Sequence, residues 1–464
     1  MYAPWIIAFL EGFSTLAVEV IAIRLAVPVV GSSITLTGVM LGIVLLALSA
    51  GYWRGGVLSA KWDKELTRSR LARNLLLAAI LYGAVAFPFE ASLLERLLDT
   101  GLGLPMAIGV TATLLLLLPI YLASQTVPML AELTNIDGHA GKASGKVLFY
   151  STLGSVAGGI VTPVWLFPSI GVSRSGYLVC AVLVGAAIVM GIARAKALAA
   201  SAAALALGII YIPRNEIFAF DSAYQSIRIV EAPTENGRIE RAFLMGGGRA
   251  SAIYADNGET SVRYVLEAER ALAETKPETV LVIGAAGFTF PRDIATSVKQ
   301  VDAVDVDPSV RRIAEEHFLK QPLPGNVRFL PLSARYAVRK LRKEGHSYGF
   351  TLVDAYFGKG LPEELATVEF FRDVRLVSQR VLVNVIMDRA MESAFARNLL
   401  ATFRDAFGAV WVKDAKPGDS ELTNVLITSW PVAGSTPWNG TGAVYRDQKN
   451  TADRDHVALI WGSD

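Results

Sequence analysis

A sharp change in hydrophobicity near residue 213 constrains the fold of this chain more than any other feature. Long apolar runs fill residues 1–213, whereas charged residues are spread through residues 214–464. A membrane-spanning helix needs about 20 mainly apolar residues. The 52% hydrophobic content also exceeds that of a typical soluble protein. We therefore predict an N-terminal all-α transmembrane bundle, residues 1–213, followed by a soluble half.

The apolar runs predict about seven membrane-spanning helices. The expected segments are Pro4–Val30, Ile34–Trp53, Leu75–Leu94, Leu104–Leu130, Val147–Leu166, Gly176–Ile192 and Leu198–Ile212. No basic segment and no cleavage site precede the first run, so we interpret it as a helix rather than a removed signal peptide. Gly154 and Gly158 have the spacing that lets a neighbouring helix approach closely.

Basic residues predict the orientation of these helices. They gather in the connections after the second, fourth and sixth segments, which places the N-terminus in the cytoplasm. With seven crossings the soluble half lies outside the cytoplasm. If the Ala-rich seventh segment does not cross, the soluble half lies inside. We expect a multi-pass protein of the inner cell membrane and leave the side of its soluble half open.

Two acidic residues, Glu11 and Glu19, fall within the first apolar segment. Ionisable side chains inside a membrane are costly, so each is a candidate functional group. One interpretation is a polar stripe, with Thr15, that receives a cation. The other is a pair of structural carboxylates, Glu11 or Glu19 bonded to a neighbouring helix or Glu19 paired with Arg24.

Several classes of function are disfavoured by composition. The net charge of +2 gives no support for nucleic-acid binding, which usually requires a basic excess. The single cysteine, Cys180, lies in an apolar run and excludes disulfides and thiolate zinc sites. No group of histidines and carboxylates has the spacing of a metal site, so we expect no metal.

The soluble half alternates between strand and helix patterns. Short strands expected at Ser226–Glu231, Arg241–Met245 and Ala250–Tyr254 predict a small β-hairpin subdomain, residues 214–275. Later strands are expected at Val280–Ile283, Gln300–Val304, Val327–Leu330, Phe350–Val353, Val381–Val385, Ala409–Lys413 and Asn424–Trp430. Helices are expected at Arg292–Ser297, Pro308–Phe318, Ala334–Arg342, Leu365–Val377 and Ala390–Phe407. This order predicts an α/β doubly wound, Rossmann-like domain over residues 276–464, of the class I S-adenosylmethionine type.

Ligands of such sheets bind beyond the carboxyl ends of the strands. Three features meet there: the small-residue turn Gly284–Gly287 and the strand-end carboxylates Asp305 and Asp354. Asp305 has the spacing of a residue that binds ribose hydroxyls. The alternative is a role at the start of the next helix, where Asp307 and Pro308 form a capping pattern.

The same segments resemble the spermidine synthase (polyamine aminopropyltransferase) family, and the whole chain resembles its membrane-fused branch. The resemblance covers residues 217–430. The matching segments are Ser222–Ile227, Val280–Gly284, Val304–Pro308, Ser333–Arg335, Phe350–Asp354, Leu361–Pro362 and Thr367–Phe371.

The resemblance implies a role for each matching residue. The residues expected to bind the nucleoside are Tyr224, Gln225, Gly284, Ala285, Gly287, Asp305, Asp307, Ser333 and Ala334. Asp354 is the expected catalytic residue. Tyr264, Tyr356 and Glu259 are expected to bind the amine substrate.

The chain also departs from the family pattern. Gly287 replaces an aspartate that helps to hold the aminopropyl amine, Phe357 replaces a second catalytic-loop aspartate, and Arg249 replaces a glutamine. A positive Arg249 near the amine path would oppose the binding of a polyamine.

We therefore expect a membrane-bound aminopropyltransferase that uses decarboxylated S-adenosylmethionine and a small-molecule amine. One alternative is transfer from S-adenosylmethionine itself to another acceptor. The other is a non-catalytic nucleoside- or polyamine-binding domain coupled to a membrane bundle. The expected partners are the lipid bilayer and the small molecules, without nucleic acid, and homo-oligomerisation is left open.

Overall fold

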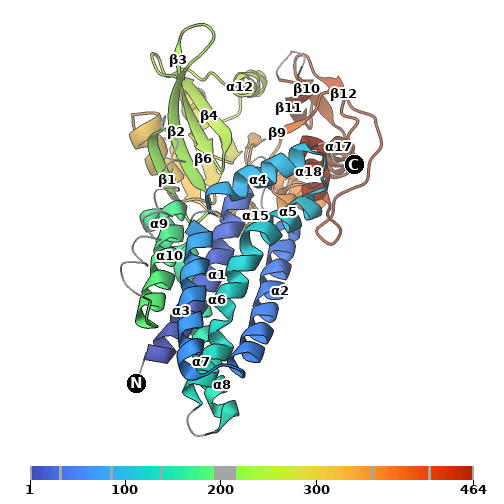
Figure 1. The fold of residues 1–464 in the computed structure, drawn as a ribbon. Helices are drawn as coiled ribbons and strands as arrows, with labels where there is room; N and C mark the ends of the chain where they lie inside the picture. Colours follow the sequence, from blue (N-terminus) through green and yellow to red (C-terminus); the bar gives the residue numbers. More distant parts are fainter. Residues whose placement is uncertain are drawn as a thin grey trace. The chain divides into compact units, whose positions relative to one another are not determined.

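The structure is a computed structural model that describes residues 3–30, 34–83, 87–135, 138–192, 216–356, 360–415 and 420–461. The chain forms two compact units that divide near residue 214. The first is all-helical and the second is α/β (Figure 1).

The N-terminal unit is a bundle of apolar helices. Its helices are α1 Ala3–Val30, α2 Ile34–Ser59, α3 Lys64–Leu81, α4 Phe87–Asp99, α5 Leu104–Ala112, α6 Leu118–Ser124, α7 Thr126–Thr134, α8 Ala140–Val161, α9 Phe167–Ile170 and α10 Val172–Val189. Five-residue π-helical turns join α5 to α6 and α8 to α9. Among the described residues, five stretches are long and apolar enough to cross a membrane: Ala3–Val30, Ile34–Ser59, Leu104–Thr134, Ala140–Ile170 and Val172–Val189.

The bounds of the third predicted segment, Leu75–Leu94, are wrong. Helix α3 begins much earlier because Asp63 caps it, with the Asp63 carboxylate accepting a hydrogen bond from the Leu66 N–H at 2.7 Å. Helix α3 ends at Leu81, and α4 is a separate helix that starts at Phe87. The seventh predicted segment, residues 198–212, falls outside the described residues.

Helices α1 and α8 meet backbone to backbone. A Cβ atom added to Gly154 would lie 2.0 Å from the Phe9 carbonyl oxygen, and one added to Gly158 would lie 2.2 Å from the Phe13 carbonyl oxygen. From the other side, a Cβ on Gly12 would lie 1.9 Å from a carbonyl oxygen of α8. The close approach expected from the glycine spacing is therefore present, and only glycine fits at these positions.

Buried polar side chains of the bundle bond to one another. The Ser151 hydroxyl on α8 donates to one carboxylate oxygen of Glu11 at 3.0 Å, and the Thr15 hydroxyl donates to the other at 3.2 Å. The Asn74 amide donates to the Gln125 side-chain oxygen at 3.0 Å. For Glu11, this geometry favours the structural interpretation over a stripe that receives a cation, because donors of the bundle already face both carboxylate oxygens.

The C-terminal unit starts with an antiparallel meander. Strands β1 Glu216–Asp221, β2 Ser226–Pro233, β3 Ile239–Met245 and β4 Gly248–Tyr254 pair in sequence order. Helix α12, Arg263–Thr275, follows them and buries Val265, Ala268, Ala271 and Leu272 along one face. We predicted neither β1 nor α12. Val265, Ala268, Ala271 and Leu272 recur with a helical period, so α12 carried a signal in the sequence that we overlooked.

Among the described residues, the second sheet has eight strands in the order β12-β10-β11-β9-β8-β5-β6-β7. Strands β5, β6, β7, β8 and β9 are parallel, and β11 and β10 close the sheet as an antiparallel pair. The strands are β5 Thr279–Ile283, β6 Gln300–Asp305, β7 Val327–Pro331, β8 Phe350–Val353, β9 Val381–Asp388, β10 Trp411–Asp414, β11 Leu422–Thr428 and β12 Thr436–Pro437. The predicted mainly parallel sheet with a late antiparallel pair is therefore present.

Helices cover this sheet, and side chains cap the start of two of them. They are α13 Thr289–Ile294, α14 Val310–Ile313, α15 Ala334–Lys343, α16 Val368–Arg375, α17 Ala394–Phe407 and α18 Ala452–Trp461. Thr367 and Ser393 accept hydrogen bonds from backbone N–H groups of α16 and α17. These caps start both helices later than predicted. We did not predict α18.

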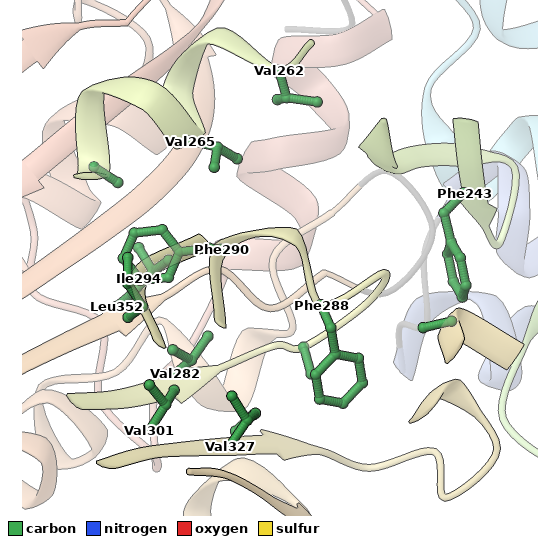
Figure 2. Close-up of a cluster of buried hydrophobic side chains, with 14 of the residues drawn as sticks. Phe243, Val262, Val265, Val282, Phe288, Phe290, Ile294, Val301, Val327 and Leu352 are labelled. Carbon is green, nitrogen blue, oxygen red and sulfur yellow. The ribbon is translucent and has the colours of Figure 1, made fainter. Parts of the chain in front are cut away.

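Alternate residues of the parallel strands enter two cores. On β5, Val280 and Val282 join one hydrophobic cluster, whereas Leu281 and Ile283 join another on the opposite face. Figure 2 shows the first cluster, in which Val282, Val301 and Val327 follow one another across adjacent strands. Burial on both faces explains why β5 and β8 are almost continuous apolar runs.

Substitutions on α8 test the contact with α1. We expect Gly154→Ala to lower stability by about 1–3 kcal/mol, because the added methyl group must push α1 away. The matched control is Gly145→Ala on the same helix, where an added Cβ meets nothing within 4 Å. That control should leave stability unchanged or raise it, since alanine favours a helix over glycine. Melting temperatures of the full chain in detergent measure both, and equal shifts would contradict the packing.

Candidate active site

A cavity of about 540 Å³ lies at the carboxyl ends of the parallel strands in the C-terminal unit. Strand ends, the β4 start and α12 supply its walls, as expected for a ligand site of a doubly wound sheet. Of the residues predicted for the site, the cavity is lined by Tyr224, Gln225, Tyr264, Gly284, Asp305, Ser333, Ala334, Asp354 and Tyr356.

Four predicted site residues do not line this cavity. Ala285 is buried beneath the turn, and the Gly287 N–H donates to the Ser251 hydroxyl at 3.1 Å. Asp307 is buried and accepts from the Ser309 N–H at 2.9 Å. Helix α14 starts only at Val310 and has no side-chain cap, so the predicted capping pattern of Asp307 and Pro308 is wrong. Glu259 lines a separate hollow in the same unit.

The turn after β5 brings two strand ends together. Gly284 has φ of +96°, and a Cβ atom there would lie 2.1 Å from the Asp354 carbonyl oxygen. Only glycine permits both this conformation and this contact. The Asp354 N–H donates to the Ile283 carbonyl at 2.8 Å, which holds Asp354 beside the turn. The position of Asp354 therefore depends directly on the turn.

Asp305 is tied to the backbone of the same turn. One carboxylate oxygen accepts from the N–H groups of Ala285 and Ala286 at 3.2 and 3.3 Å, and the other accepts from the Asp307 N–H at 3.0 Å. Burial raises the pKa of Asp305 to about 6 although these hydrogen bonds oppose the shift. Asp305 thus orders the loop and also faces the cavity.

Asp354 is the centre of a hydrogen-bond network. Its two carboxylate oxygens accept from the Asn384 amide at 2.7 Å and from the Tyr264 hydroxyl at 2.8 Å. The Asn384 side-chain oxygen accepts in turn from the Asn424 amide at 3.1 Å. Burial raises the pKa of Asp354 to about 6, and the two hydrogen bonds limit the rise. A carboxyl group that lines a cavity and has a pKa close to neutral pH is suited to proton transfer.

Tyr356 forms part of the wall beside this network. Its hydroxyl donates to the Asn384 carbonyl at 3.2 Å and accepts from the Ile386 N–H at 2.9 Å. The hydroxyl thus donates one hydrogen bond to β9 and accepts another from it, so the Tyr356 ring is held against this strand.

We missed Asn384 and Asn424, although both carried a signal in the sequence. Asn384 interrupts the apolar run Val381–Ile386, and Asn424 lies in the apolar strand β11. A polar amide inside a buried strand needs a hydrogen-bond partner. Asn424 reaches this network through Asn384, and that contact requires the antiparallel pairing of β9 with β11.

Two departures from the family pattern have structural consequences. Arg249 lines the cavity, is about half exposed, and forms an ion pair with Glu240 at 2.7 Å. A Cβ atom on Gly287 would lie 2.6 Å from the Phe318 ring, which leaves no room for an aspartate side chain. The third departure, residue 357, falls outside the described residues.

Arg335 borders the cavity beside Ser333 but is held by other groups. Its guanidinium donates to the Glu364 carbonyl and the Asp447 carboxylate, each at 2.7 Å. The positive charge of Arg335 is therefore balanced by Asp447, and the side chain serves as part of the cavity wall. Within the described ranges, no group of three or more His, Cys, Asp or Glu residues can hold a metal ion.

Comparison with known proteins confirms the family resemblance. No protein-family model matches the chain. The polyamine aminopropyltransferase of Vibrio vulnificus is 32% identical over 165 residues, which are 34% of this chain and 54% of that protein. That of Leptospira interrogans is 23% identical over 328 residues, 66% of this chain and 62% of that protein. The chain thus spans less than two thirds of the length of each relative.

Solved structures give a weaker likeness. A probable spermidine synthase from Corynebacterium glutamicum matches with a TM-score of 0.38 and 16% identity, over 47% of this chain and 80% of that chain. The spermidine synthase from Thermotoga maritima matches with a TM-score of 0.36 and 16% identity, over 53% and 88%.

The raised pKa of Asp354 predicts how its stability contribution depends on pH. The folded state holds the proton more tightly than the unfolded chain, so stability falls as pH rises from about 4 through 6. We expect Asp354→Asn to melt a few degrees above the wild type at pH 7.5, about 1–2 kcal/mol, with the gain vanishing only below about pH 4.

The control for this measurement is Asp256→Asn. Its hydrogen bond with Arg238 lowers the pKa of Asp256, so this variant should be no more stable than the wild type at pH 7.5. An Asp354→Asn protein that melts at or below the wild-type temperature at pH 7.5 would contradict the raised pKa.

Proposed function

We propose, from the similarity of this chain to the polyamine aminopropyltransferases, that its C-terminal unit transfers an aminopropyl group from decarboxylated S-adenosylmethionine to an amine at a membrane. The observation that carries the proposal is Asp354. It lies in the cavity with a pKa near 6 and is held by Tyr264 and Asn384.

The nucleoside would occupy the part of the cavity nearest β6 and β7. Asp305 ends β6 and presents a carboxylate to ribose hydroxyls, while Ser333 and Ala334 lie after β7 at the adenine edge. Gln225 is buried and lines the cavity, and its side-chain oxygen has no hydrogen-bond partner among the described residues. An unpaired buried acceptor is costly, so a donor from a ligand would stabilise it.

The transfer requires a neutral amine nitrogen. That nitrogen attacks the aminopropyl carbon beside the sulfonium, the carbon–nitrogen bond forms, and the carbon–sulfur bond breaks to release methylthioadenosine. The attacking nitrogen loses one proton, which Asp354 accepts. Tyr264 and Asn384 hold the carboxylate in one orientation, which fixes where the proton is received.

A second candidate is transfer from S-adenosylmethionine itself. Its sulfonium arm carries a carboxylate that the decarboxylated donor lacks. Arg249 lines the cavity, and the space at Gly287 cannot accept the aspartate that holds an aminopropyl amine in the family. A ligand carboxylate could compete with Glu240 for the Arg249 guanidinium.

Binding measurements test the ribose role of Asp305 and compare S-adenosylmethionine with its decarboxylated form. We expect Asp305→Ala to weaken methylthioadenosine binding at least tenfold, since two charge-assisted hydrogen bonds are worth roughly 2–4 kcal/mol together. Calorimetry of the full chain with methylthioadenosine and both sulfonium donors measures this. Asp256→Ala removes a carboxylate outside the cavity and should bind normally. Because Asp305 also orders the turn, melting curves must show that the variant is folded; unchanged affinity removes the ribose role.

The acid–base role of Asp354 is tested by rate. We expect Asp354→Asn to slow methylthioadenosine release about 10²- to 10⁴-fold while binding of the donor is retained, because the amide cannot accept the proton. Asp256→Asn should keep the full rate. A wild-type protein that forms no methylthioadenosine from decarboxylated S-adenosylmethionine and any common diamine would overturn the proposed function. An active enzyme that is indifferent to Asp354→Asn would move the base elsewhere.

A further inference from the structure

A groove of about 400 Å³ lies at the amino-terminal ends of α1 and α8 in the N-terminal unit. Its lining includes Trp5, Lys142, Gly145, Lys146, Phe149 and Tyr150, with no acidic residue among the described ones. The Lys146 ammonium lies 5.8 Å from the centre of the Trp5 ring, and the Trp5 and Tyr150 rings are 5.7 Å apart. The groove is therefore positive and has aromatic walls.

The two lysines continue into an exposed apolar stripe on α8. Lys142 and Lys146 share a helix face with Phe149, Leu153, Val156 and Ile160, because successive spacings of three and four residues keep side chains on one side. All four apolar side chains are about half exposed or more, with Phe149 at 62% and Ile160 at 58%.

The opposite face of α8 is used inside the bundle. Val147, Ser151, Gly154 and Gly158 are buried there, and the last three meet α1. The exposed stripe therefore points away from this contact and is free for a ligand that is charged at one end and apolar along its length.

We propose that this groove binds the headgroup of an anionic phospholipid, whose acyl chains lie along the stripe of α8. The phosphate would sit between Lys142 and Lys146, which donate as compact point charges. Tryptophan and tyrosine favour the membrane–water interface, where the groove must lie if α8 crosses the bilayer. The basic-residue rule places these lysines on the cytoplasmic side, whose leaflet holds anionic lipids.

The layout of charge favours a lipid over a second copy of this chain. A copy would have to offer acidic groups next to a long apolar strip. A phospholipid supplies that order of groups by its covalent structure. The proposal rests on α8 spanning the membrane and does not depend on the activity of the C-terminal unit.

The test compares lipids on the full chain in detergent by native mass spectrometry. Phosphatidylglycerol and phosphatidylcholine with identical acyl chains are the two probes. We expect phosphatidylglycerol to bind more tightly, and Lys142→Ala with Lys146→Ala to weaken it about 30-fold, as for two lysines worth about one kcal/mol each. Binding of phosphatidylcholine should not change.

Matched controls separate the groove from general positive charge. Lys61→Ala with Lys64→Ala removes two exposed lysines, one before α3 and one at its first residue, and should leave the affinity within about twofold. Inorganic phosphate at millimolar concentration should not displace the lipid, because it lacks the apolar part.

Three results of the lipid-binding measurements would overturn the proposal. They are equal binding of the two lipids, full affinity in the Lys142→Ala, Lys146→Ala protein, and displacement by phosphate alone. A dimer that forms through the α8 stripe and excludes lipid would identify a second copy as the occupant instead. Because both lysines are exposed, their replacement should leave the bundle folded, and an unchanged melting temperature in detergent verifies this.

Discussion

The cavity depends on the contact between Gly284 and the backbone of Asp354. With a Cβ atom 2.1 Å from the Asp354 carbonyl oxygen, any other residue would force β5 and β8 apart at their carboxyl ends. The same turn supplies two N–H groups to Asp305, so both strand-end carboxylates are positioned by it. Ala286 and Phe288 adopt left-handed φ values of 43° and 57° in this turn, a cost that the surrounding packing must offset.

Burial raises the pKa values of Asp305 and Asp354 to a similar level, but the two carboxylates have different surroundings. Among the described residues, Asp305 accepts hydrogen bonds only from backbone N–H groups, which tie this end of β6 to the adjoining loops. Asp354 accepts from two side chains that come from α12 and β9, and it lines the cavity beside Tyr356. A proton or a substrate group can replace a side-chain hydrogen bond to Asp354 without a change in the backbone. Replacing the backbone hydrogen bonds to Asp305 would require the loop to change its conformation. This difference supports a binding role for Asp305 and an acid–base role for Asp354.

In the N-terminal unit, too, buried polar side chains form hydrogen bonds with one another inside an apolar bundle. Glycines let α1 and α8 touch through their backbones, and the Glu11 carboxylate bonds to hydroxyls on both helices. The outer face of α8 carries apolar residues beyond its two lysines. A helix with one face built for a tight contact and the other for lipid is expected of a membrane bundle.

The sequence by itself determined the long apolar helices, the parallel strands, the strand-end positions of Asp305 and Asp354, and the glycine contact of α8. Each follows from hydrophobic period, turn chemistry or spacing within one element. The tertiary structure alone joined Tyr264, Asn384 and Asn424 to Asp354, across sequence separations of 30 to 90 residues. It also placed Glu259 in a separate hollow and buried Asp307, whose carboxylate accepts a hydrogen bond from the Ser309 N–H. Side-chain contacts over such separations depend on strand order and pairing, which local patterns do not encode.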